Sequence, residues 1–443
     1  MGVSRAIKHT LDKLDHHTLE VIKKSLASLT VKVLGMLAGL MISITLGRAL
    51  GPEGLGVINL SLKIADLLLV LAMFGLEHIV LKEVAIAHSK ENWSHINAVV
   101  SSSFKLNIII GIGIVSFFLM LAQYICVDVF KSERLLIPLI IALISVLPQI
   151  ISRVLASTIN GCKKVWQSNL VNQTLSVWFV GVVLCIMMFY GVKISVINVA
   201  FIYGLGRVCV AITMSLYWRK IRVVGERDVK VPYKNLLQAS FPLLIVNTTS
   251  MVAASAGTIM LGAFADIREV GLYNVAARLA LLTSFILQVS NSAISPKLAS
   301  LYAEKRIVEM KIMVQRVTFA LVGIALLFLL FFLFFGKDLL LIWGQGFTEA
   351  YPVLIILAVG QFFNISTGPA GYLLIMCGQQ KVHRNISLLS LIINIGLSVV
   401  LIISYGALGA AIATSATVTF ENILKWGLAK KYVGISTIGW SLK

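Results

Sequence analysis

This sequence has few acidic residues, and it has neither paired cysteines nor metal-ligand motifs. Of its 443 residues only 19 are Asp or Glu, against 38 Lys or Arg. The five cysteines stand singly, and the seven histidines show no HExxH or comparable spacing. The pattern therefore predicts neither a disulfide framework nor a metal site, and we expect no cofactor.

Charged residues of either sign are also few, at 13% of the chain, whereas 58% of residues are hydrophobic and mean hydropathy is +0.93. This composition excludes a soluble globular protein. A hydrocarbon core of roughly 30 Å needs about 20 apolar residues per helix, and the sequence has such runs one after another. It predicts an all-α polytopic membrane protein of about twelve transmembrane helices.

The apolar runs, bounded by charge, Gly or Pro, fall into two sets of six. The first set is 29–50, 57–80, 98–121, 135–157, 169–190 and 194–218. The second set is 236–263, 270–296, 317–336, 351–377, 385–404 and 407–429. Prolines in the fourth and tenth spans predict kinks in these corresponding elements: Pro138, Pro148, Pro352 and Pro369.

Residues 1–28 have no signal-peptide pattern, so we expect the first span to act as its own insertion signal. Within 4–24, four apolar residues fall on one helical face among charged residues: Ile7, Leu11, Leu14 and Val21. This spacing predicts a cytoplasmic amphipathic segment on the membrane surface. A solvated helical tail is an equal alternative.

Basic residues are concentrated on one side of the predicted membrane. With a cytoplasmic N-terminus, most Lys and Arg fall in cytoplasmic segments, where basic residues are retained during insertion. The richest segment is a linker, 219–235, which separates six spans from six. We therefore expect a multi-pass protein of the cytoplasmic (inner) membrane with both termini in the cytoplasm. The net charge of +19 then needs no nucleic-acid partner.

The two sets of spans resemble copies of each other. Five residues recur at one constant offset: Leu46, Gly47, Gly56, Asn59 and Ala65 match Leu261, Gly262, Gly271, Asn274 and Ala280. Because each set has an even number of spans, the copies share one orientation. The repeat predicts an N-terminal lobe (29–218), a C-terminal lobe (236–430) and a cytoplasmic tail (431–443). Parallel repeats of this kind typically work by alternating access.

Charged side chains inside spans are costly to insert and usually face a bundle interior or a water-filled cavity. Lys63 and Arg278 are repeat partners at the same depth of the second and eighth spans. Asn59 and Asn274 precede them by one helical turn on the same face. We expect the cations to bind phosphate oxygens and the amides to bind sugar hydroxyls.

Three further intramembrane charges are candidates. Lys105 and Arg207 lie inside the third and sixth spans and extend the predicted basic lining. Asp66 is the most deeply placed carboxylate. It is either a proton or sodium coupling site or a neutralising partner of Lys63 one turn earlier, and the sequence leaves both readings open.

Residues 47–56, with their Gly-Arg and Gly-Pro-Glu-Gly-Leu-Gly elements, resemble the junction of the first two helices in bacterial polysaccharide and O-antigen flippases. These belong to the multidrug, oligosaccharidyl-lipid and polysaccharide exporter (MOP) superfamily. Residues 407–413 and the twelve-span plan extend the resemblance over nearly the whole chain. Lipid II flippases, with two extra helices, match less well. The resemblance implies a MATE-like fold, two six-helix lobes around a cationic cavity, and an oligosaccharide substrate joined to undecaprenyl pyrophosphate.

Together these features predict a flippase for lipid-linked oligosaccharide in surface polysaccharide or lipopolysaccharide synthesis, and not an enzyme. A proton or sodium ion, membrane lipids and a polysaccharide polymerase are the candidate partners. A cation-coupled multidrug exporter of the same superfamily is the first alternative, but it would be expected to present carboxylates to cationic drugs. A membrane polymerase or ligase is the second, but the external loops are short for a catalytic surface.

Overall fold

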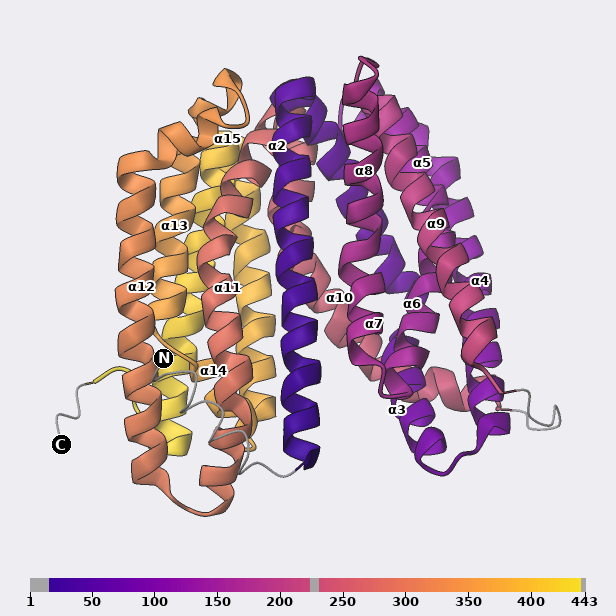
Figure 1. The fold of residues 1–443 in the computed structure, drawn as a ribbon. Coiled ribbons are helices and arrows are strands. Elements are labelled where there is room, and N and C mark those ends of the chain that lie inside the picture. Colours follow the sequence, from indigo (N-terminus) through magenta and orange to yellow (C-terminus); the bar gives the residue numbers. More distant parts are fainter. Residues whose placement is uncertain (1–15, 224–230, 440–443) are drawn as a thin grey trace, which may run out of the picture. The chain divides into compact units, whose positions relative to one another are not determined.

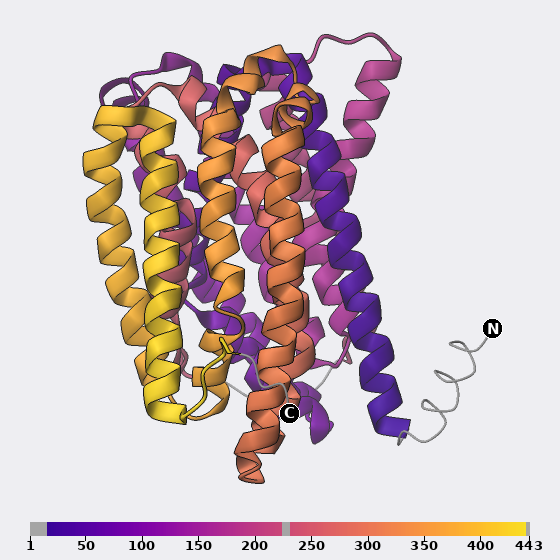
Figure 2. The same ribbon diagram turned by 90° about the vertical axis from the view of Figure 1, so that its left-hand side faces the viewer.

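The computed structural model describes residues 16–223 and 231–439, without the side chains of 16–29, 172 and 173. The predicted amphipathic face of 4–24 lies outside the described side chains. Every regular element of the described residues is a helix (Figures 1 and 2). The prediction of an all-α polytopic fold is therefore confirmed.

The helices of the first half begin with α2 (His16–Met73), α3 (Leu76–Ser89) and α4 (Trp93–Tyr124). After the turns η1 (Ile125–Val129) and η2 (Glu133–Leu135) come α5 (Leu136–Ile144), α6 (Val146–Gly161), α7 (Val165–Asn169), η3 (Leu170–Thr174), α8 (Leu175–Phe189) and α9 (Val196–Ile221). The second half comprises α10 (Tyr233–Phe264), α11 (Ile267–Ala303), α12 (Ile307–Leu341), η4 (Gln345–Ala350), α13 (Tyr351–Ser366), α14 (Ala370–Met376) and α15 (Gln380–Val433).

Nine helices of the described residues are long and apolar enough to cross a membrane. Two of them, α2 and α15, are each interrupted by a glycine, Gly51 (φ 67°) and Gly406 (φ 54°). Glycine adopts this left-handed backbone without a Cβ penalty, and Pro52 is then well placed to start the next helix. Counting these halves separately and adding the shorter apolar helix α8 gives the twelve predicted spans.

Three spans are broken within the membrane. The fourth breaks at Ser145 between α5 and α6, and the tenth breaks between α13 and α14 at Gly368 (φ 67°). These breaks lie beside Pro148 and Pro369, as the prolines predicted. The second span, predicted as one helix over 57–80, is instead divided between α2 and α3, and that expectation was wrong.

The unpredicted break, at Gly75, lies where α10 packs against the chain. The φ of Gly75 is 72°, and a Cβ there would lie 2.7 Å from the carbonyl oxygen of Ser240 and from the backbone nitrogen of Leu244, both on α10. A longer side chain would therefore collide with the neighbouring backbone. The close approach of two helices fixes the break, and such a contact between distant segments is not visible in a local apolar run.

The internal repeat extends to the turns that end helices. Left-handed residues recur at nearly the same offset in the two halves: Glu91 and Lys305, Lys131 and Gly344, Lys163 and Gly378, and Gly191 and Gly406. Four of these eight residues carry a Cβ and adopt positive φ, which such residues rarely do, so the recurrence argues against chance. The halves therefore share connection geometry as well as span order.

An ion pair also recurs, with its charges exchanged. Glu53 and Arg134 are joined at 2.7 Å, and their repeat partners Arg268 and Glu349 are joined at 2.8 Å. Each pair ties the start of the second span of its half to the connection before the fourth. The ion pair is kept in both halves, although the charge at each of the two repeat positions is reversed.

The described residues group into two compact units. The first comprises residues up to Ile42, Ala65–Ala122 and Ile137–Thr248, and the second comprises Ser43–Ile64, Gln123–Leu136 and residues from Thr249. The first has one large apolar core that joins α2, α3, α4, α6 and α9. In the second, α11, α12 and α13 pack side by side (Figure 1). The lobe limits 29–218 and 236–430 stay a prediction.

Two glycines meet where α2 and α11 cross in the second unit. A Cβ on Gly56 would collide with the carbonyl oxygen of Ile267, and a Cβ on Gly271 would collide with that of Pro52. Small residues allow membrane helices to approach this closely. Gly56 and Gly271 are repeat partners, so the crossing joins equivalent points of the two copies.

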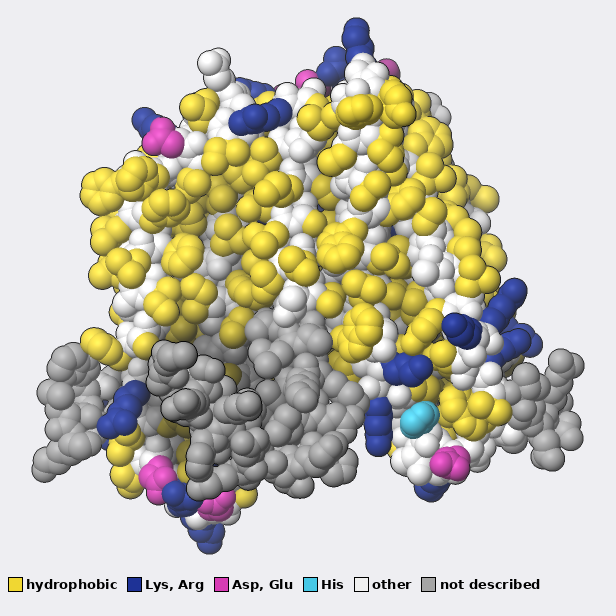
Figure 3. All heavy atoms as spheres, viewed as in Figure 1, with side chains coloured by type: hydrophobic (Ala, Val, Ile, Leu, Met, Phe, Trp, Pro, Cys, Tyr) yellow, Lys and Arg dark blue, Asp and Glu magenta, His cyan; other side chains and the backbone are white. Residues whose placement is uncertain are grey.

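The outward faces of the helices are apolar. Large side chains such as Met120, which is 83% exposed, Phe189 and Phe334 project from them. Figure 3 shows apolar side chains along the middle of the helices of both units and charged side chains near the helix ends. Lipid is the solvent that suits this distribution, so the protein is a multi-pass membrane protein.

Candidate functional site

Lys63 and Arg278 follow the glycine crossing at equal distances. Each lies seven residues after its glycine, Gly56 or Gly271, which is about 10 Å of helix rise on the same face. The two cations therefore stand on corresponding faces of α2 and α11, within the second unit. Both residues are partly exposed. No described residue pairs with the Lys63 ammonium, so its three donors are available to a ligand.

The two asparagines of the candidate site have different surroundings. Asn274 donates to the Val270 carbonyl oxygen at 2.8 Å and accepts from the Thr258 hydroxyl of α10 at 3.2 Å. The Asn274 amide oxygen therefore links α11 to α10, and its amide nitrogen is used within α11. Asn59 is partly exposed, and no described residue forms a hydrogen bond with its side chain. Of the two, Asn59 is the freer to bind a ligand.

Arg207 and Asp66 lie together in the first unit. Nη2 of Arg207 on α9 lies 3.3 Å from Oδ1 of Asp66 on α2, and the two side chains are 10% and 40% exposed. Asp66 thus pairs with Arg207 rather than with Lys63. The carboxylate keeps an exposed portion through which an ion or a proton can reach it.

Two uncharged residues of the fourth span, Ser145 at the break before α6 and Gln149 within α6, also contact Arg207. Nη1 of Arg207 donates to the Ser145 hydroxyl at 2.7 Å. With its amide turned so that oxygen faces the guanidinium, Gln149 accepts from Nη1 at 2.6 Å and from Nε at 3.0 Å. Sequence reasoning missed both residues. The proline-marked kink of this span was the available signal, because Ser145 stands at the break.

Lys105 does not join this cluster. It is exposed on α4, and no described residue pairs with it. The structure thus pairs Arg207 with Asp66 in the first unit. In the second unit it places Lys63 and Arg278, with the two asparagines, at equal spacings along α2 and α11 from one crossing. Within the described residues, no three His, Cys, Asp or Glu side chains are grouped to hold a metal ion.

The helical fold and these intramembrane charges define a polytopic membrane protein of the MATE-like class. An inward-facing multidrug resistance MATE transporter of the MOP superfamily superposes with a TM-score of 0.77 at 13% identity, covering 92% of this chain and 98% of that one. At this identity the likeness shows the fold alone.

The sequence comparison gives the family. Residues 21–302 match the family described as polysaccharide biosynthesis protein, and the chain belongs to that family. Residues 242–400 also match the MatE family. The resemblance noted from residues 47–56 is thereby confirmed.

Two curated relatives match parts of the chain. One is the capsular polysaccharide biosynthesis protein CapF of Staphylococcus aureus, 27% identical over 194 residues, or 42% of this chain and 49% of that protein. The other is the probable low-salt glycan biosynthesis flippase Agl15 of Haloferax volcanii, 26% identical over 186 residues, or 41% of this chain and 39% of that protein. The matches thus span half or less of the relatives' length.

Proposed function

We propose that this protein is a flippase, not an enzyme, that moves undecaprenyl-pyrophosphate-linked oligosaccharide across the cytoplasmic membrane for surface polysaccharide assembly. The observation that carries the proposal is the pair of intramembrane cations, Lys63 and Arg278, at equal distances from one helix crossing. A pyrophosphate needs cations with free donors, and Lys63 has them. Membership of the polysaccharide biosynthesis family and the match to a probable glycan flippase support this choice.

The binding residues of this proposal have different roles. Lys63 and Arg278 bind the pyrophosphate, Asn59 and Asn274 bind glycan hydroxyls, and Lys105 and Arg207 add positive potential along the path. Asp66, paired with Arg207 and partly exposed, is the proposed coupling site for a proton or sodium ion. Two lobes, 29–218 and 236–430, alternate in exposing the site, both termini are cytoplasmic, and a polysaccharide polymerase takes the product.

The test uses purified protein in liposomes that carry a fluorescent undecaprenyl-pyrophosphate oligosaccharide on one leaflet. Protein-dependent appearance of the label on the other leaflet, with and without an imposed proton or sodium gradient, is the expected result. Empty liposomes and liposomes with a heat-denatured sample are the controls. No crossing under any gradient would overturn the proposal.

A multidrug exporter is the second candidate, favoured by the match of residues 242–400 to the MatE family. Such a protein would expel a cationic dye from the same liposomes. The basic residues Lys63, Lys105, Arg207 and Arg278 argue against it, because they repel cations. Dye efflux without lipid movement would select this candidate.

A further inference from the structure

A second polar cluster lies in the second unit, apart from the candidate substrate site. Lys425 and Glu421, one turn apart on the second half of α15, form an ion pair of 2.6 Å. Ser387, on the first half of α15, donates to the same carboxylate oxygen at 2.9 Å. The two halves run side by side (Figure 2). With side chains 13% and 21% exposed, this ion pair has the lowest combined exposure among the described residues.

His383 adjoins this pair, one turn before Ser387 on the same helix. A Cβ built on Gly371 of α14 would lie 3.3 Å from Cε1 of His383 and 3.5 Å from Cδ of Lys425. The imidazole and the lysine side chain therefore both lie against that glycine. Nδ1 of His383 is buried and has no hydrogen-bond partner among the described residues. The ring thus holds an unused nitrogen beside a charged pair.

The internal repeat provides a comparison within the chain. The offset that matches Gly191 to Gly406 places Gly206 and Val210 where the second half has Glu421 and Lys425. The last span of the first half therefore forms without these charges, so the fold does not require them. Charges in a membrane bundle are costly to bury, and His, Glu and Asp found there commonly belong to proton pathways.

We propose that His383, Glu421 and Lys425 form a proton-binding site whose occupancy is linked to the transport cycle. A proton binds to Nδ1 of His383, and the resulting imidazolium donates toward Glu421 in competition with Lys425. Only the link to transport rests on the proposed function.

The charged groups that act on His383 from the packed second half of α15 are Glu421 and Lys425. Lys381 and Arg384, its neighbours on the first half of α15, are exposed. On α14 the ionisable side chain is Tyr372, and α11 contributes Lys297 at its end. Both of these are exposed. The competition is therefore confined to the carboxylate and the ammonium of the pair.

The first test does not require transport. Thermal unfolding in lipid nanodiscs is measured between about pH 5 and 8, the range in which histidine titrates. We expect the pH dependence of unfolding in wild type to differ from that in His383→Gln by up to one proton. His95→Gln, which removes a histidine 3.5 Å from Glu83 at the first-unit surface, should follow wild type. A His383→Gln profile that superimposes on the wild-type profile would overturn the site.

The second test uses the flipping assay with an imposed proton gradient. We expect His383→Gln and Glu421→Gln to retain exchange without a gradient and to lose its acceleration by the gradient, whereas Glu421→Asp restores part of it. Full acceleration in His383→Gln, or a wild type that flips without responding to the gradient, would overturn the link to transport. If wild type moves no lipid, the proposed function fails, and the unfolding profile still decides the proton site.

Discussion

Individual polar residues inside the membrane carry the functional argument, and Arg207 shows how they depend on one another. Its guanidinium bonds to Ser145, Asp66 and the turned Gln149 amide. An intramembrane guanidinium that loses its counter-ion is destabilising, because little water is available to replace the lost contacts. The surrounding groups therefore decide whether the charge can be accommodated.

Replacing Asp66, the counter-ion of Arg207, tests how much the protein's stability depends on this pair. We expect Asp66→Asn to lower stability by about 1–2 kcal/mol, less than the roughly 3–5 kcal/mol of a fully buried pair, because the Asp66 side chain is 40% exposed. Thermal unfolding in nanodiscs measures the change. Glu53→Gln, which breaks the exposed pair with Arg134, is the matched control and should cost less. Equal losses in the two variants would contradict this account of Arg207.

The sequence singled out the charged residues of the candidate site, but it indicated only some of the residues that contact them. Lys63 and Arg278 could be predicted, because a cation within an apolar run is conspicuous and its recurrence in the repeat strengthens the signal. The pairing of Asp66 with Arg207 could not, since the two residues are separated by 141 positions and meet only through packing. Ser145 and Gln149 are common polar residues whose role appears only beside the guanidinium.

At the scale of helices, glycine decides which elements can approach. The α2–α11 crossing leaves no room for a Cβ on either Gly56 or Gly271. Gly271→Ala should therefore lower stability by about 1–3 kcal/mol or more, because backbone rather than a flexible side chain must move. Unfolding temperature and the yield of folded protein in the membrane measure the loss. Gly323→Ala on α12, where nothing lies within 4 Å, is the control and should match wild type.

If Gly271→Ala unfolded at the same temperature as Gly323→Ala, the crossing would not be a close contact. The equal placement of Lys63 and Arg278 would then lose its structural basis.

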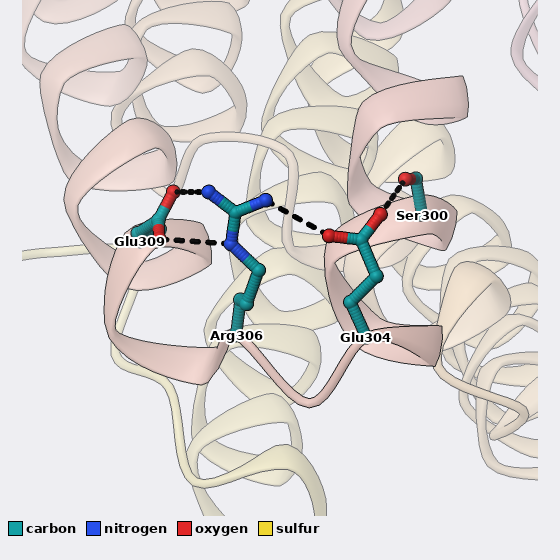
Figure 4. Close-up of polar contacts among 4 residues, drawn as sticks. All are labelled: Ser300, Glu304, Arg306 and Glu309. Carbon is teal, nitrogen blue, oxygen red and sulfur yellow. Dashed lines mark hydrogen bonds and ion pairs between the residues drawn. The ribbon is translucent and has the colours of Figure 1, made fainter.

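The turn between α11 and α12 is held by charge. Arg306 bonds to both oxygens of Glu309 and to Glu304, which also accepts from Ser300 (Figure 4). The hydrogen bond from Arg306, followed by that from Ser300, holds the pKa of Glu304 below its usual value. Since the folded-state pKa is lowered, the contribution of Glu304 is present above its unfolded-state pKa. It is lost as the pH falls through the lower folded value.

Glu304→Gln should accordingly reduce stability slightly at neutral pH, and the difference from wild type should vanish on acidification. Unfolding as a function of pH measures this change. Glu91→Gln is the control, because Glu91 occupies the corresponding turn of the first half and no described residue pairs with its carboxylate. A difference that persists in acid would show that the carboxylate charge is not the cause.

At the scale of the whole molecule, the sequence predicts the span count, the all-α class and the parallel repeat, because lipid allows few structures for such apolar runs. The proline-marked breaks near Ser145 and Gly368 were predictable for the same reason that prolines interrupt helices anywhere. The break at Gly75 was not, since it depends on the backbone of α10. Patterns within one segment were thus sufficient for the elements and insufficient for contacts between distant segments.

The repeat also explains how one chain can hold two kinds of polar site. The copies keep Gly56 with Gly271 and Lys63 with Arg278, around which a substrate site is proposed. They differ at Asp66, whose partner is Leu281, and at Glu421, whose partner is Gly206. Shared positions suit recognition of the substrate, whereas each position that differs gives one half a charged group that the other half lacks.

The central claim is that Lys63 and Arg278 together bind the pyrophosphate of a lipid-linked oligosaccharide during its passage across the membrane. The most direct measurement compares flipping in liposomes by wild type, by Lys63→Gln with Arg278→Gln, and by Lys82→Gln with Lys297→Gln. The control pair are also repeat partners, but both side chains are exposed and lie outside the candidate site. We expect the Lys63→Gln, Arg278→Gln double variant, once folded and inserted, to flip the lipid at least about tenfold more slowly than wild type. The reason is the loss of charge-assisted hydrogen bonds worth about 1.5–3 kcal/mol each. The control double variant should flip the lipid at the wild-type rate. Flipping at the wild-type rate in the first double variant would contradict the account.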